Sequence, residues 1–115
     1  MVNKSLPEVV RGEVWLVALD PTIGVEIQKT RPCVIISPPE MHDYLRSVIV
    51  APMTSGSRPA AFRVPLTFQG TGGLILLDQI RALDKQRLVR RLGHVQSATL
   101  RKALSTLGVM FASGG

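Results

Sequence analysis

The sequence predicts a mainly β domain, in which a small, highly curved sheet or barrel carries one helix at its C-terminal end. Many short apolar runs are separated by Gly and Pro turn signals, and the one segment with helical periodicity follows all of them. The chain has 115 residues, of which 45% are hydrophobic, and this is enough for one modest core but too little for two. We therefore expect residues 1–115 to form a single domain.

Six apolar runs are predicted to supply the strands. They are residues 11–20, 31–38, 47–54, 61–68, 74–84 (two short strands or one strongly bent strand) and 89–95. The first run stops at the turn signal Asp20-Pro21. The second begins at Arg31-Pro32, where the proline restricts the arginine to extended geometry. A polar connection, EMHDYLR, leads to the third run.

The later elements are less regular. Residues 61–68 alternate apolar and polar side chains, which predicts a half-exposed strand at an edge of the sheet, and GTGG then breaks it. The run 74–84 is interrupted at Asp78-Gln79, and KQRL after it has the length of a single helical turn. Ser97 is the expected N-cap of the helix. One face of that helix carries Leu100, Ala103, Leu104, Leu107 and Phe111.

Charge is distributed unevenly along the chain. Residues 1–84 hold eight Lys or Arg and eight Asp or Glu, whereas residues 85–115 hold six basic residues and no acid. The whole net charge of +6 therefore comes from the C-terminal segment. Such a segment favours a polyanionic partner, either nucleic acid or an acidic protein segment, although basic patches also occur without a ligand.

Composition and motifs disfavour several classes of protein. No apolar run approaches the roughly 18 residues that span a bilayer, and the first ten residues lack the apolar core of a secretory signal. The single cysteine, Cys33, is expected in the core. There is no HExxH motif, Cys or His cluster, Gly-rich phosphate loop or GxSxG elbow. We expect a cytoplasmic protein with no metal, no cofactor and no membrane partner.

Two opposite charges, Glu26 and Arg31, lie close together ahead of the second predicted strand. One interpretation is a solvated ion pair worth about 0–1 kcal/mol. The other is a phosphate site, because metal-free cleavage of RNA needs a base for the 2′-hydroxyl, a cation for the phosphorane and an acid for the leaving oxygen. Glu26, Arg31 and Thr54 supply a carboxylate, a guanidinium and a hydroxyl at predicted strand ends or adjoining loops. Spacing alone leaves the two interpretations nearly balanced.

The two histidines, His42 and His94, are an alternative acid and base pair. His42 lies in a polar connection and His94 in a basic strand, and no neighbour in the sequence would orient either ring. We expect structural or surface roles for both.

Four segments carry a resemblance to a known family. RGEVWLVALDPTIGVE, RPCVIIS, VAPMTSG and LLDQIRALDKQRL resemble, in order and spacing, the MazF/PemK ribonuclease toxins of bacterial toxin-antitoxin pairs. The resemblance runs from about Arg11 to Gly93, and the C-terminal helix fits the closing helix of the family. It implies a small SH3-like barrel of the MazF/CcdB type, a homodimer, and metal-independent, sequence-selective cleavage of single-stranded RNA by 2′-hydroxyl attack.

The resemblance also implies roles for particular residues. Arg31, in the RP pair, and Thr54, in the PxT turn, match the recurrent catalytic positions, at which they would stabilise the phosphorane and hold the scissile phosphate. Glu26, in the GxE loop, is the expected base, and Asp78 is the second choice. Some members carry an arginine two positions before this aspartate, but Leu76 stands there in this chain.

Further residues are expected to contact RNA. The loops GVEIQKT and TSGSRPAAF would select the bases, because unstacked bases are recognised through their edges and by stacking. The expected RNA-binding residues are Gln28, Ser55, Arg58, Asp78, Gln79 and Arg87. Asp78 and Gln79 are groove or structural residues in this interpretation. Together with Arg90 and Arg91, Arg87 would form a positive surface for the RNA backbone, and a cognate antitoxin would cover it with an acidic, flexible segment.

Two other functions are compatible with such a barrel. One is a non-enzymatic, CcdB-like poison of DNA gyrase, and the other is a catalytically silent RNA-binding protein. The RP and PxT motifs argue against a pure binder, because binding alone does not require Arg31 and Thr54. The fold does not decide between these functions, so the site residues must.

Overall fold

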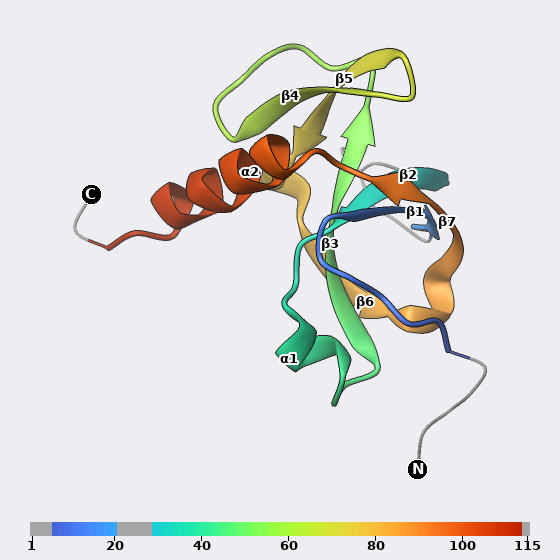
Figure 1. Cartoon of the computed structure of the whole chain (residues 1–115). Helices are drawn as coiled ribbons and strands as arrows, with labels where there is room; N and C mark the ends of the chain where they lie inside the picture. Colours follow the sequence, from blue (N-terminus) through green and yellow to red (C-terminus); the bar gives the residue numbers. More distant parts are fainter. Residues whose placement is uncertain (1–5, 21–28, 114–115) are drawn as a thin grey trace.

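The computed structural model describes residues 6–20 and 29–113 of the chain. Within these residues, seven antiparallel strands form a sheet that curls into a half-barrel, and a C-terminal helix packs on it (Figure 1). The strand order is β4-β5-β3-β2-β1-β7, with β6 paired to β3 off this path. The elements are β1 (Glu13–Ala18), β2 (Thr30–Ile35), α1 (Pro39–His42), β3 (Ser47–Thr54), β4 (Arg63–Phe68), β5 (Thr71–Leu76), the 3-10 turn η1 (Leu77–Gln79), β6 (Arg81–Asp84), the 3-10 turn η2 (Lys85–Arg87), β7 (Leu88–His94) and α2 (Ser97–Met110).

This architecture confirms the predicted fold class and the positions of the predicted strands. β4 lies at one edge of the sheet, as its alternating pattern predicted. The interrupted run 74–84 consists of two strands, because η1 separates β5 from β6 at Asp78-Gln79. The turn predicted in KQRL is η2, which Asp84 caps by accepting a hydrogen bond of 2.8 Å from the amide of Gln86.

Three local predictions were wrong. The polar connection after β2 contains helix α1, in which Pro39 occupies the first turn, where a missing N–H costs nothing. The strand 61–68 does end before GTGG, but only Gly70 of this segment belongs to the break, because Gln69 and Gly70 make the turn, both with positive φ, and β5 begins at the next residue. Ser97 is the first residue of α2, and the N-cap is Gln96.

The central strands are buried on both faces, which accounts for their unbroken apolar sequence. On one face, Cys33 and Val50 belong to the core inside the curled sheet. On the other, Val34 and Ala51 belong to a second core, which includes Ala103 of α2. Burial raises the pKa of the Cys33 thiol to about 12, so this cysteine is an inert core residue, as predicted.

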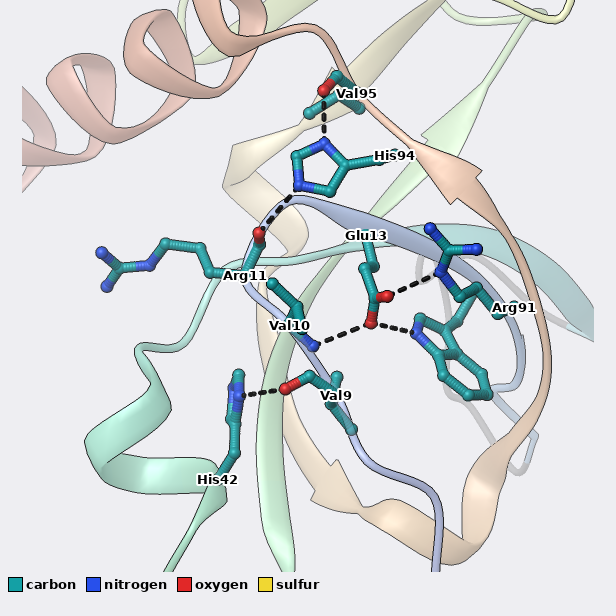
Figure 2. Close-up of polar contacts among 9 residues, drawn as sticks. Val9, Val10, Arg11, Glu13, His42, Arg91, His94 and Val95 are labelled. Atoms are coloured by element: carbon teal, nitrogen blue, oxygen red, sulfur yellow. Dashed lines mark hydrogen bonds and ion pairs between the residues drawn. The ribbon is translucent and has the colours of Figure 1, made fainter.

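A buried carboxylate joins the first and last strands. Glu13 is only 7% exposed, and its carboxylate accepts hydrogen bonds from the amide of Val10 (2.8 Å), Nε1 of Trp15 (3.2 Å) and Nε of Arg91 (2.6 Å), as Figure 2 shows. Burial raises the pKa of Glu13, but these hydrogen bonds outweigh it and leave the pKa below its usual value. Removing Arg91 would therefore leave a buried charge partly uncompensated.

A buried histidine ties α1 to the rest of the molecule. His42 is 3% exposed, and its Nε2 lies 2.6 Å from Oγ of Ser37. Its Nδ1 lies 3.2 Å from the carbonyl oxygen of Val9 (Figure 2). Ser37 Oγ also accepts a hydrogen bond of 2.9 Å from the amide of Ile49. All three contacts are satisfied by the neutral imidazole that donates from Nδ1 and accepts from the serine hydroxyl. The carbonyl of His42 accepts a further bond from Nζ of Lys85.

We expect the stability of the protein to fall as the pH drops below about 6.5, the ordinary pKa of histidine in an unfolded chain. Burial lowers the pKa of folded His42, and the bond to Val9 and the charge of Asp43 offset this only in part, while Lys85 and Arg11 lower the pKa further. Below that pH, the unfolded chain therefore binds protons that the folded chain excludes. Thermal unfolding from about pH 7.5 to about pH 5.5 measures the effect.

The variant His42→Gln separates this contribution from those of other titrating groups. It should lose about 1–3 kcal/mol of stability at neutral pH, because buried hydrogen bonds are lost. Its melting temperature should then fall less on acidification than that of the wild-type protein. Parallel pH profiles for the two proteins would contradict the assignment.

Candidate active site

A pocket of about 290 Å³ lies where β2 begins and β3 ends, beneath the β4-β5 hairpin. Its lining includes Arg31, Thr54 and Ser55, three of the residues expected to contact RNA. We call it the strand-end pocket. The rest of its wall consists of Pro32, Met53, Leu66, Phe68, Gln69, Thr71, Gly72, Gly73 and Leu92.

Strand pairing explains why Arg31 and Thr54 lie together. β2 and β3 are antiparallel, and Cys33 pairs with Pro52 at the last position of their register. Arg31 and Thr54 each lie two residues beyond this pair, towards the same end of the sheet. Because side chains two residues apart share a face, the register directs both groups to one side of the sheet.

The two side chains are differently constrained. Thr54 is half-buried, pairs with Leu74 of β5, and accepts a hydrogen bond of 3.2 Å on Oγ1 from the amide of Gly56. Arg31 is exposed, and its guanidinium makes no hydrogen bond or ion pair with any residue in 6–20 or 29–113. The pocket therefore combines a fixed hydroxyl with a cation that has no anionic partner in the described part of the chain.

The predicted base, Glu26, and the predicted RNA-binding residue Gln28 lie outside the described residues. The structure does show how the ends of their loop are joined. The amide of Leu19 donates to the carbonyl of Lys29, and the amide of Lys29 donates to Oδ1 of Asp20, both at 2.9 Å. The described residues on either side of this segment are thus hydrogen-bonded to each other, and β2 begins at the strand-end pocket.

Asp78, the second choice for the base, is held in an ion pair. Its carboxylate accepts two hydrogen bonds from Arg63, from Nε at 3.2 Å and from Nη2 at 3.0 Å, and the first cause of the raised pKa of Arg63 is this bonding. Arg63 is the cross-strand partner of Leu76, which lies two positions before Asp78. The guanidinium that meets Asp78 therefore comes from β4. Asp78 is not among the residues that line the strand-end pocket.

The other predicted contacts also lie outside this pocket. Arg58 is exposed in the loop between β3 and β4, and Gln79 is half-buried in η1. Arg87 donates from Nη1 to the carbonyls of Ala18, at 3.2 Å, and Asp20, so it fixes the end of β1. Roles for these residues in RNA binding stay predictions.

Some of the basic residues in the segment 85–115 make contacts within the folded protein. Lys85 is buried, and Arg91 is paired with Glu13. By contrast, Arg90, Arg101 and Lys102 are exposed and form no ion pair or hydrogen bond through their side chains within the described residues. These three side chains are the exposed basic groups of this segment that have no partner in the described part of the chain.

Neither histidine lines the strand-end pocket, so neither fits the alternative acid and base pair there. In the described part of the chain, no three His, Cys, Asp or Glu side chains are grouped closely enough to hold a metal ion. The helices of that part are all too short or too polar to cross a membrane.

Sequence reasoning missed the contribution of the β4-β5 hairpin. Leu66, Phe68 and Gln69 line the pocket, although they are far from Arg31 and Thr54 in the sequence. The signal for them was indirect: the alternating edge strand and the glycines after it indicate a hairpin, but only the pairing of β5 with β3 places that hairpin at the site.

Comparison with known proteins agrees with this geometry. The family model of the PemK-like, MazF-like toxins of type II toxin-antitoxin systems matches residues 10–111. The chain is 41% identical over 106 residues to endoribonuclease PemK of Escherichia coli, covering 87% of this chain and 80% of that protein. It is 36% identical over 100 residues to endoribonuclease MazF9 of Mycobacterium tuberculosis, covering 78% and 85% of the two chains.

Solved structures show the same fold. The crystal structure of MazF from Deinococcus radiodurans superimposes with a TM-score of 0.79 and 25% sequence identity, covering 93% of this chain and 97% of that one. One crystal form of the MazE-MazF complex from the same organism has a TM-score of 0.68 and 25% identity, covering 91% and 95%. The match to the family model extends over almost all of the chain, and it includes the strands that bring Arg31 and Thr54 together. The chain therefore belongs to the family of PemK-like, MazF-like toxins of type II toxin-antitoxin systems.

Proposed function

We propose that this protein is a metal-independent endoribonuclease that cleaves single-stranded RNA by attack of a 2′-hydroxyl on the adjacent phosphate. The observation that carries the proposal is the meeting of Arg31 and Thr54 in one pocket, where the guanidinium has no anionic partner among the described residues. The relatives named endoribonuclease PemK and MazF support the same activity.

The pocket fits the charge that develops in this reaction. As the 2′-oxygen bonds to phosphorus and the bond to the 5′-oxygen breaks, negative charge gathers on the phosphorane oxygens. Arg31 presents a planar set of N–H donors to those oxygens. The amide of Gly56 occupies an acceptor position of the Thr54 hydroxyl, which leaves its O–H to donate to the phosphate. The products are a 2′,3′-cyclic phosphate and a 5′-hydroxyl.

Proton transfer completes the mechanism. A base must take the proton of the 2′-hydroxyl, and we assign this role to Glu26. Asp78 remains the second choice, although its ion pair with Arg63 opposes it. Arg31 is the proposed donor to the leaving 5′-oxygen, in spite of the high pKa of an ordinary guanidinium.

The proposed partners follow from charge and from the family. We propose a homodimer, and a cognate antitoxin whose acidic, flexible segment binds exposed basic side chains of residues 85–115, among them Arg90. The solved complexes of MazE with MazF support an antitoxin partner. Binding of the antitoxin across the RNA surface would block substrate.

The activity is tested directly on purified protein and single-stranded RNA in excess EDTA. Cleavage should persist, because none of the proposed steps uses a metal ion. The fragments should carry a 2′,3′-cyclic or 3′-phosphate and a 5′-hydroxyl, which end-specific labelling identifies. Intact RNA under conditions in which the protein stalls DNA gyrase would instead establish a CcdB-like poison.

Substitution of the two pocket residues tests their assignment. Arg31→Ala should lower kcat by about 10²–10³, because a donor to the transition state is lost. Thr54→Ala should lower it by roughly 10-fold to 100-fold, the effect of one hydrogen bond to a charged group. Single-turnover cleavage of RNA measures both, and Arg46→Ala is the matched control, because Arg46 is exposed and does not line the pocket. Wild-type rates in Arg31→Ala and Thr54→Ala would refute the site even if the protein cleaves RNA.

Two adjacent glycines provide a test of how β3 positions Thr54. A Cβ on Gly73 would lie 2.8 Å from the carbonyl oxygen of Thr54, whereas a Cβ on Gly72 would meet nothing within 4 Å. Gly73→Ala should therefore displace the end of β3, cost about 1–3 kcal/mol of stability and lower kcat about tenfold or more. Gly72 lines the same pocket, and the variant Gly72→Ala should keep the stability and the kcat of the wild-type protein. Equal rates in the two variants would show that this contact does not position the site.

A further inference from the structure

A second pocket adjoins the strand-end pocket. Its volume is about 350 Å³, and residues from the end of the β4-β5 hairpin and from the segment that leads from β7 into α2 line it. We call it the hairpin-helix pocket. Leu66, Phe68 and Gln69 line both pockets, so these three residues form a wall that the pockets share.

The shared wall is fixed in place from two directions. Gln69 Nε2 donates a hydrogen bond of 3.0 Å to the carbonyl of Leu92, which ties the hairpin turn to β7. The ring of Phe68 lies over Gly93 so closely that a Cβ there would be 3.1 Å from Cζ of the phenylalanine. Phe68 therefore stands as a positioned, half-buried ring between the two pockets.

An aromatic ring at this place is suited to a nucleobase. The chain has only one Trp, one Tyr and three Phe, and Phe68 is the only one of these five that lines either pocket. The imidazole of His94 also lines the hairpin-helix pocket, but both of its nitrogens lie against carbonyl oxygens. Single-stranded RNA is commonly held by stacking of its bases on such rings. An RNA strand whose phosphate contacts Arg31 and Thr54 must either continue past the wall that the two pockets share or turn away from the hairpin.

The hairpin-helix pocket also offers groups that can read a base edge. Gln96 and Thr99 line it, and neither side chain makes a hydrogen bond to another residue in the described part of the chain. The amide of Gln96 offers both donors and an acceptor. His94 forms a wall instead, because Nδ1 lies 2.5 Å from the carbonyl oxygen of Val95 and Nε2 lies 3.2 Å from that of Arg11 (Figure 2).

We propose that Phe68 stacks on a base of the RNA substrate, and that the hairpin-helix pocket holds the nucleotide adjacent to the one whose phosphate lies on Arg31 and Thr54. Gln96 and Thr99 contact the edge of that base and contribute to sequence preference. The proposal rests on the proposed ribonuclease function, and it adds a specificity subsite that the loops flanking β2 and β4 do not supply.

The test compares three variants in binding to RNA that cannot be cut. The cleaved bond is mapped with the wild-type protein, and the 2′-hydroxyl at that bond is then replaced by 2′-O-methyl. Phe68→Leu should weaken binding by roughly 10-fold to 100-fold, the usual effect of losing one stacking contact. Phe68→Tyr keeps the aromatic ring and should bind RNA more tightly than Phe68→Leu does. Tyr44→Leu removes an aromatic residue that is 85% exposed and lines neither pocket, and it should change nothing.

Crosslinking gives a second readout that needs no variant. RNA with 4-thiouridine next to the cleaved bond should crosslink, in the wild-type protein, to peptides that contain Phe68 or Gln96 and Thr99. Crosslinks confined to other segments would overturn the proposal, even if Phe68→Leu fails to fold. Equal binding by Phe68→Leu, Tyr44→Leu and wild type would overturn it too, with the ribonuclease function intact. If the wild-type protein does not cleave RNA, the proposed function fails first, and the two failures are thereby distinguished.

Discussion

The arrangement of the molecule depends on the hydrogen bonding of β3. This strand pairs with β6 over its first half, with β2 at its centre and with β5 at its end, so it belongs to both parts of the curled sheet. Its side chains are buried on alternate faces in two different cores. The end of β3 is consequently the point at which β2 and the β4-β5 hairpin meet, and the strand-end pocket lies there.

Much of the fold was predictable because burial on both faces leaves a clear trace in the sequence. β2 and β3 read as continuous apolar runs, and the break at Asp78-Gln79 corresponds to η1. Helix α1 was not predictable from local pattern, since four residues provide no periodicity and the helix is held by the tertiary contacts of His42. Local sequence carries no information about such contacts.

The candidate site was predictable only in part. Arg31 and Thr54 could be identified because both lie at strand ends that carry family motifs, and the structure brings them to one pocket. The wall formed by the hairpin depends on long-range pairing, which spacing does not encode. The pairing of Asp78 with Arg63 likewise crosses from one strand to another. The excess of basic residues near the C-terminus was visible in the sequence. The sequence did not show that Lys85 is buried and that Arg91 pairs with Glu13, while other basic side chains remain exposed.

The turn at Gln69 places stability and site organisation in opposition. Gln69 has a φ of 51°, a conformation that costs a residue with a Cβ about 1–2 kcal/mol and that glycine adopts without penalty. Glycine at this position would relax the backbone, yet it would remove the side chain that ties the hairpin to Leu92. A turn without this backbone strain would thus leave the wall between the two pockets less firmly held. The relief of backbone strain would be offset by the loss of this hydrogen bond, which contributes about 0.5–1.5 kcal/mol, so the strain at Gln69 accompanies the contact that orders the wall.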